Sequence, residues 1–221
     1  MRTNVRLLMY SRINRGDQTE RPAEPVRLLT RLEAVSIRRR LGQLPSRAAD
    51  NLFWLGRYLE RTEGTLRVTR ALAELSFDAA EQARTAPARL AELLKLWGAT
   101  RKEASTSSED ILSDALLGDA DGAVPTLISS AARTASVIRE RLSPDATRTL
   151  EDFRSVVLDE NLLLAERADR GLRILAALSG LIQENMNRIS GWRFLQTGRR
   201  LERGAMTCAM VQQLGSRRAE E

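Results

Sequence analysis

The apolar residues of this chain recur at the spacing of an α-helix. Leu52, Leu55, Leu59 and Leu66 follow the i, i+3, i+7 pattern of one helix face. The chain is 43% hydrophobic but only 4% aromatic, which suits a core built from Ala and Leu helices. A sheet would require more Val, Ile, Tyr and Thr in alternating runs. The sequence therefore predicts an all-α helical bundle.

Start and stop signals divide the chain into predicted helices. Ser46 follows a proline and can cap a helix running to about residue 75, and Ser143 can cap a helix with Pro144 at its first position. The sequence Ser107-x-x-Asp110 has the spacing of a capping box. Helices are also expected over 87–97, 108–117, 124–142, 144–167, 169–186 and 190–215, with a polar loop over 100–108.

Basic charge is concentrated at the N-terminus. Residues 1–45 hold 10 Arg and 4 acidic residues, whereas residues 46–221 hold 25 residues of each sign. We predict a partly disordered basic arm or linker over 1–43, whose helical-looking stretch is 26–41, followed by one helical domain over 44–221. The arm is either an irregular extension or a nucleic-acid-binding segment, and the neutral body gives no electrostatic footprint for DNA or RNA.

The absence of histidine excludes several kinds of catalytic and metal site. Ser-His and Cys-His nucleophile pairs, the commonest zinc ligand and the di-iron Glu-x-x-His pattern all require it. Cys208 is the only cysteine and lies in an apolar stretch, which predicts a buried, inert thiol. No apolar run approaches the roughly 18 residues of a membrane span, and the N-terminus has no secretory h-region. We expect a cytoplasmic protein with no metal, cofactor or membrane partner.

A short motif occurs twice in the chain. The sequence GRYLER at 56–61 reappears as GRRLER at 198–203, which places Glu60 and Glu202 at equivalent positions. Both copies follow aromatic residues, which indicates a duplicated helix. The bundle is therefore expected to contain two related Glu-Arg helices.

The helical wheel around Glu202 carries no other charge. If this face packs inward, the carboxylate needs a cation, either Arg199 one turn away or an arginine from the other repeat. The face around Glu60 is more open, because Gly56 and Gly64 leave space for another helix or a ligand. Two interpretations stay open: a reciprocal buried clasp between the repeats, or a site that binds a ligand or partner.

The two motif regions resemble those of the alpha-E domain family. Residues 44–63 read LPSRAADNLFWLGRYLERTE and resemble the family's opening helix, while 191–204 read GWRFLQTGRRLERG and resemble its second motif. A shorter stretch, IRERLS at 138–143, fits between them. The family positions carried onto this chain are Arg57, Glu60, Arg61, Arg199, Glu202 and Arg203.

The resemblance implies an accessory, all-helical domain that is fused to, or encoded beside, a circularly permuted ATP-grasp ligase. Such systems are expected to make or modify peptides by ATP-dependent amide-bond formation, and the family does not establish an activity for the domain itself. Because family members continue with further helices and this sequence stops at Glu221, we expect a C-terminally shortened form that can bury its exposed face by dimerising.

Three functions follow from these observations. The first is a partner module of an ATP-grasp-type ligase. The second is an independent enzyme or ligand-binding domain that uses the Glu-Arg pairs. The third, and least supported, is nucleic-acid binding through the basic arm.

Overall fold

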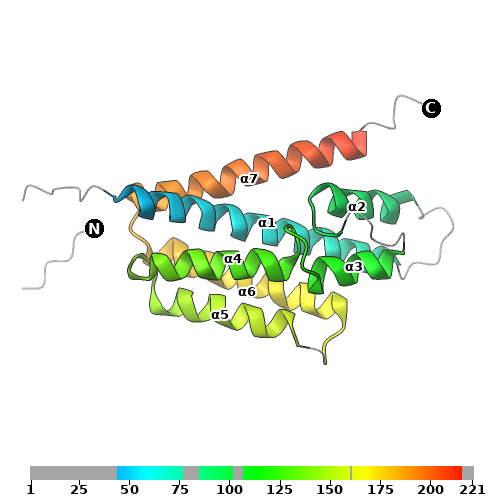
Figure 1. Ribbon diagram of the computed structural model, residues 1–221, viewed down its shortest axis with the longest axis horizontal. Coiled ribbons are helices and arrows are strands. Elements are labelled where there is room, and N and C mark those ends of the chain that lie inside the picture. The colour runs from blue at the N-terminus through cyan, green and yellow to red at the C-terminus, as the bar shows by residue number, and fades with distance from the viewer. Residues whose placement is uncertain (1–43, 77–84, 102–106, 160, 216–221) are drawn as a thin grey trace, which may run out of the picture. The chain divides into compact units, whose positions relative to one another are not determined.

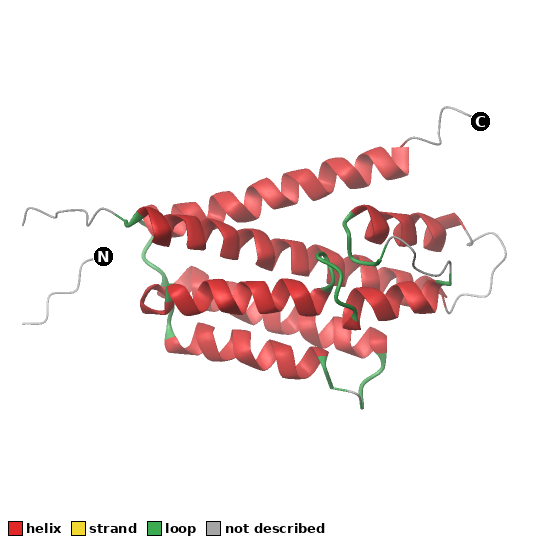
Figure 2. Ribbon diagram, viewed as in Figure 1, coloured by secondary structure: helices red, strands yellow, loops and turns green. Residues whose placement is uncertain are grey.

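The computed structural model describes residues 44–76, 85–101, 107–159 and 161–215. The predicted arm over 1–43 and the middle of the predicted loop over 100–108 lie outside the described residues. The described part contains seven α-helices and no strand, which confirms the all-α prediction (Figure 2). They are α1 Ser46–Ser76, α2 Thr85–Leu96, α3 Ser108–Leu117, α4 Val124–Val137, α5 Pro144–Val157, α6 Leu164–Asn185 and α7 Ser190–Gly215.

Helix α1 is the central element of the bundle. It packs against α7 on one side and against α4 and α6 on another (Figure 1). Leu52, Leu55, Leu59 and Leu66, the residues of the predicted face, are all buried in the cluster that α1 forms with α4, α5 and α6. The leucine spacing therefore identified the core-facing side of α1.

A second cluster of buried side chains forms where α2 and α3 pack on the C-terminal half of α1. It includes Val68 and Leu72 of α1 and Trp97, which follows α2. Gly98 ends α2 in the left-handed conformation, with φ of 68°, and the backbone N–H groups of residues 98 and 99 donate back to carbonyls of the last turn. This turn holds Trp97 in the space between α1 and α7, beside the site described below.

Several helix starts agree with the sequence-based predictions. Pro144 is the first residue of α5, as predicted. Ser46 is the first residue of α1, and the carbonyl of Pro45, which accepts from the backbone N–H groups of residues 48 and 49, marks the cap position one residue before the predicted one. The Ser143 hydroxyl caps α5 by accepting from the backbone N–H of Ala146 at 3.2 Å. At α3, the hydroxyl of Ser107 accepts from the backbone N–H of Asp110 at 3.1 Å.

Two predicted helix ends were wrong. The helix expected over 124–142 ends at Val137 and continues as the 3₁₀ turn η2 Arg139–Arg141. The helix expected over 144–167 ends at Val157, and α6 begins at Leu164 rather than at 169. The carboxylate of Asp159 explains this break, because it accepts hydrogen bonds from the backbone and the amide group of Asn161 at 3.0 and 2.9 Å. Such local side-chain bonds compete with the helix.

A buried arginine fixes the connection between α5 and α6. The guanidinium of Arg167 donates to the carbonyl oxygens of Val157 at 3.3 Å and Leu162 at 2.9 Å. These bonds satisfy backbone acceptors at the end of α5 and in the following turn.

None of the described helices is both long enough and apolar enough to cross a membrane.

Candidate functional site

Helices α1 and α7 run parallel and approach most closely at a pair of glycines. A Cβ atom on Gly56 would lie 2.2 Å from the carbonyl oxygen of Leu195, and one on Gly198 would lie 2.1 Å from that of Phe53. Both contacts are with backbone, which cannot swing aside as a side chain can. The two helices then diverge toward their C-terminal ends (Figure 1). Glycine is required at both positions because each helix backbone fills the space beside the other.

One turn beyond this crossing, Glu202 of α7 is held by two arginines of α1. Arg57 donates from Nε to Oε2 at 2.6 Å, and Arg61 donates from Nε to Oε1 at 2.6 Å. The Glu202 side chain is only 1% exposed. The buried carboxylate therefore obtains its cations from the other repeat and not from Arg199.

The same arrangement is repeated in the opposite direction around Glu60 of α1. Arg199 donates from Nε to Oε2 at 3.1 Å, and Arg203 donates from Nε to Oε1 at 2.5 Å. Arg203 also donates from Nη2 to Oε2 at 2.9 Å. Each Nε atom contacts the same carboxylate oxygen as its counterpart in the other repeat. A local twofold axis between α1 and α7 therefore relates the two halves, which together we call the Glu-Arg clasp.

The clasp satisfies two carboxylates that are almost withdrawn from water. The Glu60 side chain is 8% exposed, and hydrogen bonding to it raises the pKa of Arg203 above the ordinary arginine value. Unpaired buried carboxylates would be costly, so the four arginines are needed for the glutamates to remain inside. The structure brings together all six residues that the sequence singled out: Arg57, Glu60, Arg61, Arg199, Glu202 and Arg203.

The two halves of the clasp differ in their surroundings. Arg199 also donates to Glu63 at 3.0 Å and to the hydroxyl of Ser179 on α6 at 3.1 Å. Its counterpart Arg57 instead lies over the ring of Trp54, 5.4 Å from the centroid. Glu63 lies three residues after Glu60 and so shares its side of the helix, but nothing in the sequence indicated that Ser179 would be close.

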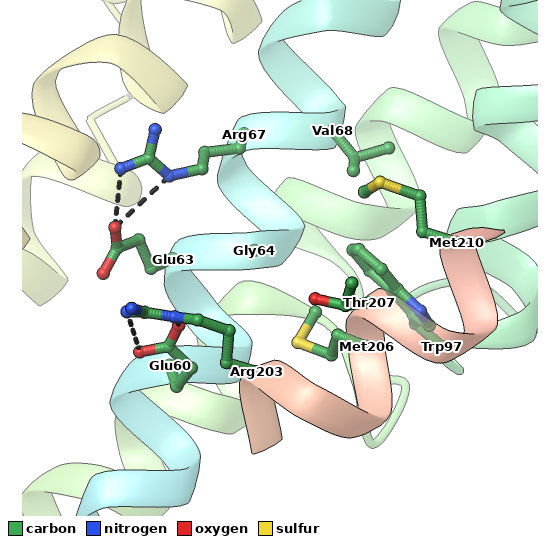
Figure 3. A pocket seen from close by; sticks show the side chains of 10 residues that line it. All are labelled: Glu60, Glu63, Gly64, Arg67, Val68, Trp97, Arg203, Met206, Thr207 and Met210. Atoms are coloured by element: carbon green, nitrogen blue, oxygen red, sulfur yellow. Dashed lines mark hydrogen bonds and ion pairs between the residues drawn. The ribbon is translucent and has the colours of Figure 1, made fainter. Parts of the chain in front are cut away.

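A cleft of about 320 Å³ opens beside Glu60 where α1 and α7 diverge (Figure 3). Charged side chains stand along one part of it, including Arg203 and the ion pair of Glu63 with Arg67 at 2.6 Å. The rest of the lining comes from Gly64, Val68, Trp97, Met206, Thr207 and Met210. Glu202 does not line this cleft, so the two motif glutamates do not converge on one cavity. In the described chain, no three acidic or cysteine side chains gather in a way that could hold a metal ion.

Comparison with known proteins identifies the family. The model of the Alpha-E family, described as a predicted alpha-helical domain with a conserved ER motif, matches residues 44–220. The chain belongs to the alpha-E family. In this alpha-E domain the ER dipeptide occurs in both repeats, and each glutamate of the motif binds arginines of the opposite helix.

Curated relatives of the alpha-E chain are longer proteins. The uncharacterized protein Rv2567 of Mycobacterium tuberculosis is 26% identical over 192 residues, covering 75% of this chain and 22% of that protein. The uncharacterized protein Mb2597 of Mycobacterium bovis matches to the same extent. The chain thus spans about a fifth of the length of these relatives. No solved structure matches it significantly.

Two further side chains of the alpha-E domain were predicted in the wrong environment or left open by the sequence. Cys208 is exposed, not buried, because it lies on the side of α7 that faces away from α1 and the bundle. Among the tryptophans, Trp97 is buried whereas Trp54 is exposed.

Proposed function

We propose that this chain is a non-catalytic partner module that docks on an ATP-grasp-type ligase in a system for peptide synthesis or modification. The observation that carries the proposal is the Glu-Arg clasp. Its two glutamates are each held by two arginines and are nearly excluded from water. A general acid or base must exchange a proton with a substrate, whereas Glu202 lies outside the cleft and Glu60, which lines it, has both carboxylate oxygens bound by Arg199 and Arg203.

The extent of the relatives also supports a modular role. The chain corresponds to about a fifth of each curated relative, so the alpha-E domain occurs there beside a large amount of other sequence. A ligase as the partner is what the family resemblance implies. In this proposal the motif preserves the shape of the domain, while surfaces outside the clasp make the contact.

Purified chain mixed with an ATP-grasp ligase from the same organism tests the proposal. We expect a complex of defined stoichiometry by size-exclusion chromatography with light scattering, together with altered ADP release or product formation by the ligase. The chain alone should hydrolyse no ATP. If no complex forms at about 100 μM of each protein and ligase turnover is unchanged, the proposal is wrong.

The cleft beside Glu60 favours a second candidate, a ligand-binding domain. Its apolar lining and charged edge suit a small molecule that carries both an apolar group and a charge, such as an amino acid or short peptide. Amide NMR shifts at Gly64 and Thr207 on addition of apolar dipeptides would support it, provided that Thr207→Trp, which fills the cleft, abolishes them. Unchanged spectra at about 10 mM dipeptide would exclude this class of ligand.

A further inference from the structure

The outward face of α7 is the counterpart of the face that α1 buries in the core. With the offset that relates Glu60 to Glu202, Phe194 and Leu201 correspond to Leu52 and Leu59 of α1. Leu59 is 4% exposed, whereas Leu201 is 51% exposed. The same helical surface is therefore covered in one repeat and uncovered in the other.

The stripe continues toward the C-terminal end of α7. Cys208 corresponds to Leu66, and Phe194, Leu201 and Cys208 are seven residues apart, so they lie along one side of the helix. Phe194 and Cys208 are exposed like Leu201. We call these three residues the α7 stripe.

In α1 the equivalent face is covered by α4 and α6. Leu66 lies so close to α6 that a Cβ on Gly171 would be 3.1 Å from its Cδ1 atom. Because the local twofold axis relates α1 to α7, the equivalent face of α7 points to the opposite side of the α1–α7 pair. In Figure 1 the three helices α4, α5 and α6 lie on the side of α1 away from α7, and no described helix covers the far side of α7.

The clasp arginines carry the same asymmetry. Arg199 reaches the hydroxyl of Ser179 on α6, the helix that covers α1. Its counterpart Arg57, on the uncovered side, stacks on the exposed ring of Trp54 and is the more exposed of the two arginines. A helix packed on the α7 stripe would lie beside Arg57, just as α6 lies beside Arg199.

The charges around the stripe indicate what kind of helix fits it. The only acidic residue of α7 is Glu202, which is buried, whereas Arg193, Arg200 and Arg203 are exposed. Arg193 and Arg200 directly precede Phe194 and Leu201, so they border the stripe along one edge. The exposed charge of α7 is entirely basic.

A second copy of α7 and the stretch 26–41 are the two segments of this chain that could cover the stripe, and both are basic like the stripe's own border. Two copies of α7 packed through Leu201 would bring together two surfaces whose exposed charged residues are all arginines, and such like-charge pairing is unfavourable. The helical-looking stretch 26–41 contains five Arg and one Glu, so it is basic as well. Acidic flanks on the occupant would complement the arginines of α7.

We propose that the α7 stripe is the docking site for an amphipathic helix of a partner protein, with an apolar Leu/Ala face and acidic flanks. On α7 this helix takes the place that α4 and α6 take on α1. The proposal goes beyond a ligase-associated role, since it specifies a surface and a partner chemistry whatever the partner's activity is.

Two designed peptides of about 20 residues test it in the full chain. They share one Leu/Ala stripe and differ only in Glu or Lys on both flanks. The Glu-flanked peptide should bind at least about tenfold tighter by calorimetry, with an affinity that falls as salt is raised. Because Cys208 is the only cysteine, slower alkylation of its thiol in the presence of peptide reports directly on coverage of the stripe.

Variants locate the binding face and its charge. Leu201→Glu should abolish binding and the protection of Cys208, whereas Leu163→Glu, at an exposed leucine before α6, should leave both unchanged. Reversing both Arg193 and Arg200 to Glu should transfer the preference to the Lys-flanked peptide. Circular dichroism confirms that each variant is folded.

Four outcomes would overturn the proposal. Equal affinity for the two peptides would contradict the charge argument. If both Leu201→Glu and the double reversal still bound the Glu-flanked peptide as the unmodified chain does, the contact would lie elsewhere. Protection of Cys208 that rises with the concentration of the chain alone, without peptide, would show that a second copy covers the stripe. Absence of any binding by the Glu-flanked peptide at about 1 mM would also refute it.

Discussion

The substitution Glu202→Gln removes one charge from the clasp while keeping the shape of the side chain. Gln still offers a carbonyl oxygen to one arginine, but it no longer balances Arg57 and Arg61, and its amide group faces a donor. The variant therefore isolates the electrostatic part of the clasp. Packing at the glycine crossing is left intact.

The expected loss of stability follows from the burial of the three groups. Removing one partner of a fully buried ion pair costs about 3–5 kcal/mol. Glu202 meets that condition at 1% exposed, but Arg57 and Arg61 are 24% and 36% exposed and can regain water. We therefore expect a loss of about 2–3 kcal/mol, or roughly 4–12 °C in Tm for a domain of this size.

Urea denaturation of the full chain, followed by circular dichroism, measures this loss. Asp119→Asn is the matched control, because Asp119 forms an exposed pair with Arg101 at 2.8 Å and should leave the midpoint unchanged. A loss below about 0.5 kcal/mol for Glu202→Gln, the range of ordinary surface substitutions, would refute the idea that the clasp holds the repeats together.

Three further predictions test other parts of the structure. Gly198→Ala places a Cβ 2.1 Å from a carbonyl oxygen of α1 and should cost more than about 2 kcal/mol by urea denaturation, whereas Gly204→Ala, with nothing within 4 Å, should gain up to about 1 kcal/mol. Arg57→Lys loses the Nε donor and should cost about 1–2 kcal/mol in the same assay. Hydrogen bonds from Asn161 lower the pKa of Asp159 below the unfolded value of about 3.9. The stability that ionised Asp159 contributes is therefore fully present above that pH and is lost as the pH falls through the folded pKa. Asp159→Ala should flatten this part of the curve of unfolding free energy against pH.

The sequence was sufficient where local rules act alone. Ser143 and Pro144 marked the start of α5, and Ser46 marked that of α1 to within one residue, because helix starts depend on a few neighbouring residues. The wheel around Glu202 contained no other charge, which required a cation from outside that face. The choice between Arg199 and an arginine of the other repeat depended on how α1 and α7 cross, and only the structure decided it.

Other features depended on tertiary context. The break after Val157 is set by the turn at Asp159 and by the buried Arg167, and neither residue interrupts an amphipathic pattern by itself. Cys208 was misplaced because α7 has two apolar sides, one toward α1 and one outward, and periodicity does not tell which of them is covered. The duplicated motif does not decide it either, because the side that α1 buries is the side that α7 exposes.

The most direct test of the account is a pair of double-mutant cycles, one on each half of the clasp. Arg57→Met is combined with Glu202→Gln, and Arg199→Met with Glu60→Gln, and the free energy of unfolding is measured for every single and double variant. A clasp related by a local twofold axis predicts a coupling of about 1–3 kcal/mol in both cycles. Additivity within about 0.3–0.5 kcal/mol in either cycle would contradict the claim that reciprocal Glu-Arg pairs join α1 to α7.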